Sequence, residues 1–297
     1  MQRFCFIFVS CVLAISIAPA DDANQAKPAS ERFELRHQLS AEQVLRYEVT
    51  HVAKTKTRMK GNEEIANVHT TSVRAWRVGD VMPNEMTFDH VVETVKMTQQ
   101  SGDAEEVRWD SQSGDDPPDV FSVVASQIGS PLATVTIDEK GGEMHREDHG
   151  GTKASLGMGQ LALTLPESSV AIGDTWSVPS EVKVRGDNAE IKTIKTRQVY
   201  TLKKVKAGVA TIGIRTQPLT PIDDASVKSQ VVQQLSNGTI RFDVDNGYLL
   251  SKELDWDETV VGFQGANSMM EYRARMTETL LPPSVLQATS PSRSDKR

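Results

Sequence analysis

The amino-acid sequence predicts a mainly β protein made of two tandem, related, antiparallel half-barrel-like sheets, each with one packed helix (α+β). Two observations predict this fold class. Apolar and polar residues alternate over long stretches separated by tight turns, which is the pattern of antiparallel strands with one buried face. The order hairpin, helix, hairpin also occurs twice along the chain, which predicts an internal duplication.

The first hairpin of each copy has two alternating strands around a short turn. The stretches are AWRVGDVMPNEMTFDHV (75–91), with a turn at Pro83-Asn84, and VYTLKKVKAGVATIGIR (199–215), with a turn at Ala207-Gly208. Without a gap they align at six alternating positions: Trp76 with Tyr200, Val78 with Leu202, Val81 with Val205, Met86 with Ala210, Phe88 with Ile212, and His90 with Ile214. Each stretch is therefore predicted to form a β-hairpin.

A short stretch with apolar residues at helical spacing follows each of these hairpins. Residues 117–129 begin with prolines and end at Gly129. Residues 223–238 offer Asp224 as an N-terminal cap and end at Asn237-Gly238. Both stretches are predicted to be helices.

A second hairpin follows each predicted helix, at 133–147 and at 239–253. The turn sequences are Asp-Glu-Lys-Gly-Gly in the first copy and Asp-Asn-Gly in the second. The repeated order supports a duplication. The alternative is that the two copies are unrelated, because any antiparallel protein contains similar hairpins. The turn lengths, which differ between the copies, favour this alternative.

One more strand is predicted at the start of each copy. The first lies within 39–52 and contains Tyr47, and the second opens at Trp176. A short helix is an option at 157–165, before the second strand. Trp176 and Trp256 are interpreted as core aromatics, with ligand stacking as the alternative.

The two ends of the chain are not expected to belong to the fold. Residues 1–20 have one charge, a short apolar run and the small-x-small pattern Ala18-Pro19-Ala20, at which signal peptidase cuts. The predicted location is therefore periplasmic or secreted; an uncleaved anchor or a lipid on Cys11 are the alternatives. The chain divides into signal peptide 1–20, flexible leader 21–32, first β unit 33–164, second β unit 165–281 and disordered tail 282–297.

Composition excludes several classes of function. Both cysteines, Cys5 and Cys11, fall inside the predicted signal peptide, so disulfides, zinc-cysteine clusters and cysteine nucleophiles are not expected in the mature chain. The chain has 33 basic and 40 acidic residues, a net charge of −7, and removal of Arg3 makes the charge −8. This acidity argues against nucleic acid as a partner, and no transmembrane segment is predicted in the mature chain.

The stretch HREDH (145–149) is the best candidate for metal chemistry. In a strand, alternation places His145, Glu147 and His149 on one face, and zinc needs three or four ligands of this kind. His90 could approach from a neighbouring strand.

The duplication offers a test of this site. If Gly142 corresponds to Gly247, His145 matches a leucine of the second copy and a metal site gains support. If Gly141 corresponds to Gly247, His145 matches Ser251 and stays on the polar face. The second register keeps apolar residues against apolar residues, so we expect a solvated strand end and assign no metal. A pH-sensitive polar patch is the remaining alternative.

The acidic loop DSQSGDDPPD (110–119) is the other cation candidate, because calcium prefers several oxygens from one loop. Its carboxylates do not alternate as in an EF-hand, so we interpret it as a connection whose Asp115 or Asp116 favours the start of the next helix. The sequence motifs of common nucleophiles and nucleotide-binding loops are missing. No catalytic, cofactor-binding or metal residue is assigned, no cofactor is expected, and the protein is predicted not to be an enzyme.

Four sequence features together resemble a known family. They are LRYEV (45–49), WRVGDV (76–81), LPESSVAIGDTW (165–176) and DVDNGYL (243–249). The combination resembles a family of uncharacterised exported bacterial proteins known only as a domain of unknown function, and the resemblance covers most of residues 33–281. It implies no catalytic residues. More distantly, the expected sheet is similar to the half-barrels of periplasmic lipoprotein carriers and lipid-binding lipoproteins, which implies a fold and not a function.

The predicted function is that of an exported, non-enzymatic binding protein that holds a lipid or another apolar ligand on a concave sheet face. The alternative is a structural or interaction module of the cell envelope, with an envelope protein as partner. A third interpretation is a metal-dependent hydrolase centred on His145, Glu147 and His149.

Overall fold

The computed structural model describes residues 31–149, 160–186 and 190–283. The predicted signal peptide, and almost all of the predicted leader and tail, lie outside these ranges. Within them the protein is mainly β, as the sequence predicts.

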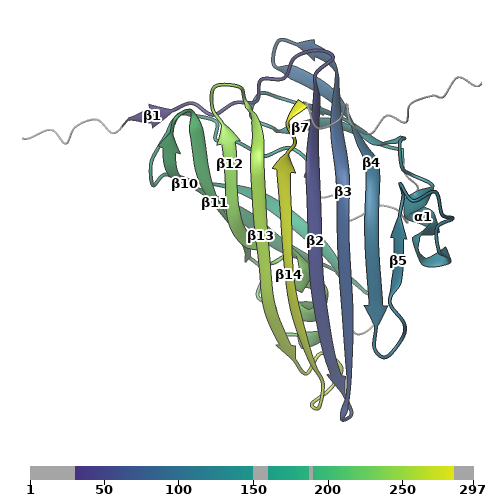
Figure 1. The fold of residues 1–297 in the computed structure, drawn as a ribbon. Helices are drawn as coiled ribbons and strands as arrows, with labels where there is room; N and C mark the ends of the chain where they lie inside the picture. The colour runs from purple at the N-terminus through teal and green to yellow at the C-terminus, as the bar shows by residue number, and fades with distance from the viewer. Residues whose placement is uncertain (1–30, 150–159, 187–189, 284–297) are drawn as a thin grey trace, which may run out of the picture. The chain divides into compact units, whose positions relative to one another are not determined.

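Fourteen strands are formed by the described residues, and twelve of them make one open antiparallel sheet (Figure 1). The strands are β1 (Arg32–Phe33), β2 (Val44–Met59), β3 (Asn62–Met82), β4 (Glu85–Ser101), β5 (Val107–Asp110), β6 (Pro131–Ile137), β7 (Glu143–Asp148), β8 (Val170–Ala171), β9 (Thr175–Arg185), β10 (Ile191–Lys206), β11 (Val209–Pro218), β12 (Asn237–Asp243), β13 (Tyr248–Val261) and β14 (Met269–Leu280). The order across the large sheet is β7-β6-β4-β3-β2-β14-β13-β12-β11-β10-β9, with β5 paired to β4. β1 and β8 form a separate two-stranded sheet.

The two predicted copies follow the same strand order and the same register. The first copy reads β7-β6-β4-β3-β2 across the sheet and the second reads β13-β12-β11-β10-β9. Trp76 pairs with His90 in the first copy, as Tyr200 pairs with Ile214 in the second. This arrangement agrees with the alignment of the two hairpins. A common origin of the copies stays a prediction, as does the boundary between residues 164 and 165.

Strands β2 and β14 join the two copies into one sheet. They pair antiparallel along twelve residues, from Tyr47 with Leu280 to Arg58 with Met269. Strand β14 has no counterpart in the first copy, because the order across the sheet places it between the two sets of five strands.

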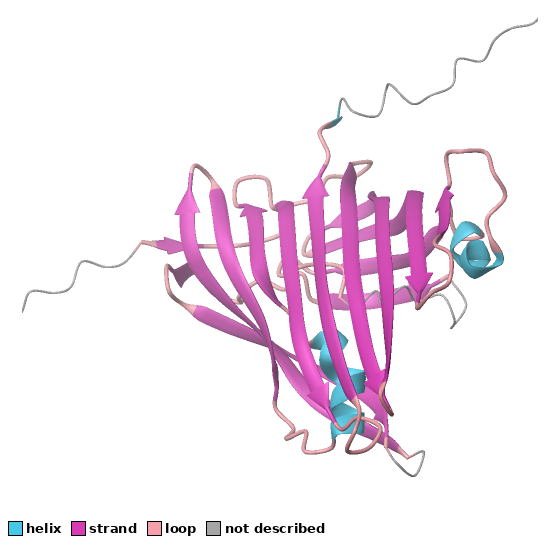
Figure 2. Ribbon diagram, turned by 60° about the horizontal axis from the view of Figure 1, so that its bottom comes forward, coloured by secondary structure: helices cyan, strands magenta, loops and turns pink. Residues whose placement is uncertain are grey.

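One face of the large sheet carries the principal hydrophobic core, and we call it the inner face. Tyr47, Trp76, Leu202 and Phe242 lie on it. Side chains from β4 and β6 belong to the same core as side chains from β10, β11 and β12. The sheet must therefore bend, so that the inner faces of the two copies approach each other. Figure 2 shows this curvature, with helix α2 on the concave side.

Both predicted helices are present but are shorter than predicted. The first consists of the 3-10 turn η1 (Asp119–Phe121) and α1 (Ser122–Ala125). The second consists of α2 (Ala225–Val231) and the 3-10 turn η2 (Val232–Gln234). Both stretches are rich in valine and serine, whose helix propensity is low, and such short helices form only where packing supports them.

The predicted start of the second helix is confirmed, whereas its predicted stop at Asn237-Gly238 is wrong, because η2 ends at Gln234 and both residues belong to β12. The side chain of Asp224 accepts hydrogen bonds from the backbone N–H groups of Ser226 and Val227, so it caps α2. Gly129 follows the first helix with a φ of +84°, the left-handed conformation that glycine adopts without a steric cost.

Two extended segments cross the turns of the second hairpins. The backbone N–H of Gln38 donates to the carbonyl of Gly247 (3.1 Å), and that of Leu165 donates to the carbonyl of Lys140 (2.7 Å). The optional helix at 157–165 is not formed in the described residues 160–165. The backbone groups of this segment form hydrogen bonds with other parts of the chain instead. The carbonyl of Leu163, for example, lies 2.8 Å from Nε2 of His37.

Candidate functional site

The register of β7 decides the position of His145. Gly141 and Gly247 both adopt positive φ values, +76° and +71°. His145 pairs with Thr136, in the place that corresponds to Ser251 paired with Arg241 in the second copy. Gly141 is therefore the counterpart of Gly247, and His145 lies on the polar face, as the sequence favours.

The structure does not assemble a metal site from the HREDH stretch. His145, Glu147 and His149 are exposed. Nε2 of His149 lies 2.8 Å from the hydroxyl of Thr134, and Nδ1 lies 3.7 Å from the Glu147 carboxylate. His90 is on the inner face, away from the face of His145. Among the described residues, no three His, Cys, Asp or Glu side chains are grouped so that they could hold a metal ion.

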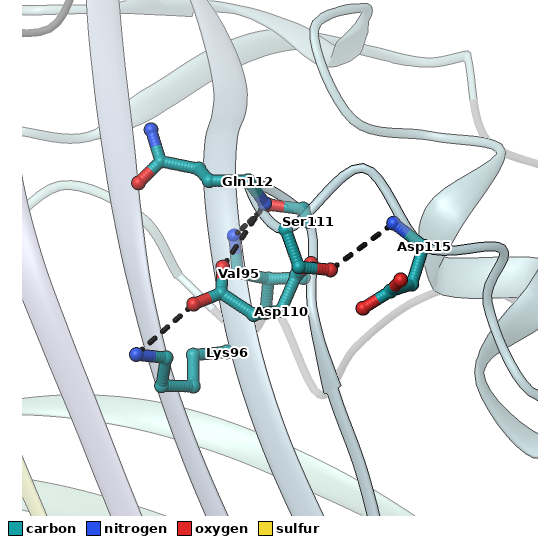
Figure 3. Close-up of polar contacts among 7 residues, drawn as sticks. Val95, Lys96, Asp110, Ser111, Gln112 and Asp115 are labelled. Carbon is teal, nitrogen blue, oxygen red and sulfur yellow. Dashed lines mark hydrogen bonds and ion pairs between the residues drawn. The ribbon is translucent and has the colours of Figure 1, made fainter.

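The acidic loop uses its oxygens for internal contacts (Figure 3). The Asp110 carboxylate accepts a hydrogen bond from the backbone N–H of Gln112 (3.0 Å) and pairs with Nζ of Lys96 (3.0 Å). These two contacts, in that order, lower the pKa of Asp110. The hydroxyl of Ser111 accepts from the N–H of Val95 (2.9 Å). The contacts fix a turn, which supports the interpretation as a connection.

The two candidate ligand-stacking aromatics are part of the packing. Trp176 and Trp256 are half-buried. Their indole N–H groups donate to the carbonyls of Thr164 (2.9 Å) and Gln233 (3.0 Å). Trp176 also stacks on Tyr200, with ring centroids 5.4 Å apart. This agrees with their interpretation as core aromatics.

A shallow hollow of about 590 Å³ lies beside Trp176, and Arg32, Glu167 and Asp174 also line it. The guanidinium of Arg32 contacts the carboxylate of Asp174 (3.4 Å) and the carbonyl of Ser169. We do not assign the candidate site to this hollow, because its guanidinium is already held by Asp174 and Ser169.

The strongest candidate is a set of ionisable side chains on the inner face of the large sheet. Alternation along the strands and the strand registers place them on the same face as the principal core. We call them the inner-face cluster: Arg74 on β3, His90 on β4, Lys252 on β13 and Glu278 on β14, with His51 on β2 and Arg146 on β7 at its margins.

Glu278 and Lys252 form the anchoring ion pair of this cluster. Their charged atoms are 2.6 Å apart, and the side chains are 13% and 22% exposed. Burial raises the pKa of Glu278, but Lys252, with help from Arg74 and His90, more than offsets this, so the pKa lies below its ordinary value. Glu278 is therefore a carboxylate at neutral pH.

The guanidinium of Arg74 forms few hydrogen bonds and ion pairs for a charged group that is half-buried. It is half-buried, and its Nε donates to the hydroxyl of Ser72 (3.2 Å). No described carboxylate forms an ion pair with its guanidinium. Burial lowers the pKa of Arg74, and the attraction of Glu278 offsets this only in part. The charge remains, since an arginine side chain does not lose its proton in a protein.

His90 is a buried neutral ring beside this charge. It is 2% exposed, and its Nδ1 has no hydrogen-bond partner in the described structure. Burial, followed by the positive charge of Arg74, lowers the pKa of His90 to about 4. Burial and Arg74 likewise lower the pKa of His51. Both rings are neutral at neutral pH.

Sequence reasoning missed most of this cluster. It considered His90 only as a metal ligand, and it did not single out Arg74, Lys252 or Glu278. The alignment of the two first hairpins contained a usable signal. Arg74 and His90 correspond to Gln198 and Ile214, so the first copy has ionisable residues at inward positions where the second copy has neutral ones.

Comparisons with known proteins give only a distant structural likeness. No family model matches the chain, and no curated protein matches it. The solved structures that match include one described as "Lipid-Protein Interactions in Lipovitellin", with 12% sequence identity and a TM-score of 0.43. The match covers 82% of this chain and 26% of that chain, so this protein spans about a quarter of its length. The resemblance to a family of exported bacterial proteins therefore stays a prediction.

The helices of the described residues are too short or too polar to cross a membrane.

Proposed function

We propose that this protein is a non-enzymatic binding protein that holds an amphipathic ligand on the inner face of its large sheet. The observation that carries the proposal is a row of half-buried side chains between the principal core and α2. The row crosses four neighbouring strands, and we call it the inner stripe: Thr70 on β3, His51 on β2, Met276 on β14 and Leu254 on β13.

The inner stripe is bounded by fully packed regions. On one side lies the principal core, which includes Tyr47 and Ile240. On the other side, Val232 of η2 packs against Ala53, Val260, Tyr272 and Ala274. Between them the side chains keep part of their surface accessible, so an apolar chain laid along Met276 and Leu254 would complete the packing.

The ionisable groups suit the polar end of such a ligand. Lys252 and Glu278 are two residues from Leu254 and Met276 on the same strands, so they lie next to them on the same face. Burial of an apolar chain contributes about 0.8 kcal/mol per methylene group, so about ten methylenes contribute roughly 8 kcal/mol before the cost of association. The cost of association is at least about 4 kcal/mol, so ten methylenes alone give about millimolar affinity, and burial of about fifteen methylenes is needed for micromolar affinity.

Native mass spectrometry of protein purified without detergent tests the proposal. We expect an added mass that organic extraction removes, and saturable rebinding of an eighteen-carbon amphiphile. Met276→Gln should weaken rebinding about tenfold, because it places an amide where the chain lies. Thr277→Gln, on the outer face of the same strand, is the matched control and should have no effect. Purified protein that carries no amphiphile and rebinds none would rule out the function.

We also propose that the protein acts outside the cytoplasm, on the basis of the signal-like pattern of residues 1–20. N-terminal sequencing of the protein from fractionated cells tests this. A mature chain that begins at Asp21 in the periplasm or medium is the expected result, and an intact N-terminus in the cytoplasm would contradict it.

A further inference from the structure

We propose that the polar end of the ligand is a single anionic group, either a carboxylate or a phosphate monoester, and that Arg74 binds it. This inference rests on the proposed function and names the chemistry of its ligand. It follows from four features of the inner-face cluster: the hydrogen bonds of Arg74, the ion pairs of its charged neighbours, the buried Nδ1 of His90, and the residues at the same positions in the second copy.

Most N–H donors of the Arg74 guanidinium form no hydrogen bond within the described structure. An arginine side chain carries five N–H donors in a planar fork, and the described structure uses only the Nε donor of Arg74, toward Ser72. The terminal N–H groups have no partner among the described residues. A carboxylate or a phosphate matches this fork with two parallel hydrogen bonds.

The neighbouring charged groups form ion pairs that do not include Arg74. Lys252 and Glu278 form one pair at 2.6 Å. Arg146 contacts the carboxylates of Asp148 (2.8 Å) and Glu143 (3.6 Å). An anion at Arg74 would therefore pair with a guanidinium that no described carboxylate contacts, whereas a cation there would be repelled by it.

His90 supplies a second, independent feature of the same place. Arg74 pairs with Val92 and Trp76 pairs with His90, so the two polar side chains are diagonal neighbours on the inner face. The buried Nδ1 of His90 lacks a partner. A neutral imidazole beside an arginine can donate one hydrogen bond to an anion without adding a further charge to the cluster.

The corresponding hairpin of the second copy has the same strand register but lacks the two ionisable side chains. Gln198 and Ile214 occupy the positions of Arg74 and His90, and both are neutral. Arg74 is therefore not required by the architecture of the hairpin. Its position on β3, beside Tyr47 of β2, puts it at the same side of the inner stripe as Glu278.

Three amphiphiles with the same eighteen-carbon chain test the inference: oleic acid, oleoyl lysophosphatidic acid and oleyl alcohol. The probes differ only in the head group, and their affinities are measured by displacement of a fluorescent eighteen-carbon probe. We expect one or both acids to bind the unmodified protein about 10- to 100-fold more tightly than the alcohol, the range for a charge-assisted hydrogen bond. The tighter acid identifies whether the head group is a carboxylate or a phosphate.

Arg74→Gln, which introduces the residue of the second copy, should remove the preference for acids, so that the acids and the alcohol bind with similar affinity. Arg74→Lys keeps the positive charge but not the planar guanidinium, so it should retain part of the preference for acids. It replaces Arg74→Gln as the test if that variant does not fold. Arg77→Gln, on the outer face of the same strand, is the control and should bind like the unmodified protein.

The outcomes separate this inference from the function on which it rests. If all three amphiphiles bind equally, or if Arg74→Gln keeps the preference for acids, the anionic head group is wrong and the binding function stands. If none of the three binds, the binding function itself fails, and the inference with it.

Discussion

Arg74 and His90 lie on the inner face of β3 and β4, at the positions that Gln198 and Ile214 occupy on β10 and β11. The two hairpins share their register, and each has a bulge in its first strand. The backbone frame therefore tolerates both a charged and a neutral inner face. What differs is the covering of that face by the rest of the chain.

The helices account for this difference. In the second copy, Val227 and Val231 of α2 pack against Val184 of β9 and Ile194 of β10, so this part of the inner face is a hydrophobic cluster. In the first copy, Phe121 packs instead against Val95 and Trp109, at the β4–β5 margin of the sheet. The centre of the first inner face is thus left to polar and ionisable side chains. The same repeat unit carries either a hydrophobic cluster or the proposed binding surface, according to where its helix lies.

The largest expected effect tests whether the two copies form one cooperative unit. Phe88 and Ile212 hold matching core positions, and both are fully buried. We expect Phe88→Ala to lower the free energy of unfolding by about 3–5 kcal/mol and Ile212→Ala by about 2–5 kcal/mol. Urea unfolding followed by tryptophan fluorescence and by far-UV circular dichroism should give one shared transition for each variant. Two separate transitions, with only one of them shifted, would show that the copies unfold independently.

The second prediction concerns the pH dependence of the free energy of unfolding. His90 contributes to this dependence, whereas Ile214, its counterpart in the second copy, has no titratable group. Arg74, Arg146 and Glu278 are the charged groups that act on His90, and its folded pKa of about 4 lies below the unfolded value of about 6.5. Between these values the unfolded chain binds more protons than the folded one. The stability contributed by the neutral ring is therefore present above pH 6.5 and is lost as the pH falls toward 4, by up to about 3 kcal/mol.

His90→Ile, which copies the second hairpin, should remove this part of the pH dependence. The measurement is the free energy of unfolding in urea at about pH 7 and about pH 4.5, compared between the two proteins. His37, His51 and Glu278 also lose stability on acidification, since their folded pKa values are lowered, but they do so in both proteins. An equal loss in both would mean that His90 is not the titrating group.

The third prediction concerns the glycines at which extended segments cross the second hairpins. A Cβ on Gly141 would lie 2.2 Å from the carbonyl oxygen of Leu163, and one on Gly247 would lie 2.3 Å from the backbone nitrogen of Gln38. Alanine at either position should lower the free energy of unfolding by about 2 kcal/mol or more, from the positive φ and the clash together. Gly262 is the control: its φ is positive but its Cβ would meet open space, so alanine should cost about 1 kcal/mol.

The smallest effect is expected at the exposed end of the first copy. His145→Ser introduces the residue of the second copy on the polar face of β7, and it should change the free energy of unfolding by less than about 0.5 kcal/mol. Elemental analysis should find no stoichiometric zinc in the unmodified protein. Zinc at one equivalent that disappears in His145→Ser would reopen the metal-dependent alternative.

Local features of the fold were predictable from the sequence. Alternation aligned Trp76 with Tyr200 and His90 with Ile214, which occupy matching places in the two hairpins, and the aspartate at 224 signalled the start of α2. These features depend on a period of two residues and on side chains near in sequence. The correct choice of Gly141 as the counterpart of Gly247 rested on the same rule, because it kept apolar residues on one face.

The candidate site was not predictable in the same way. Arg74 and Glu278 are charged, and such residues in an alternating strand normally mark the solvent face. Alternation puts Arg74 on the face of Trp76, but its nearness to Glu278 becomes visible only when β14 is placed beside β2, which brings residues more than 200 positions apart onto one surface. No local pattern encodes that pairing, and β14 had no partner in the repeat that would have indicated it.

The sequence by itself determined the strands, their turns and the matching registers of two hairpins, because backbone conformation and the two-residue period are set by near neighbours. The tertiary structure decided that the two copies share one sheet and one core. It also decided that α2 covers one inner face while the other keeps its charges. The physical reason is that edge pairing and face covering depend on the total surface buried by distant segments, which no single stretch of sequence contains.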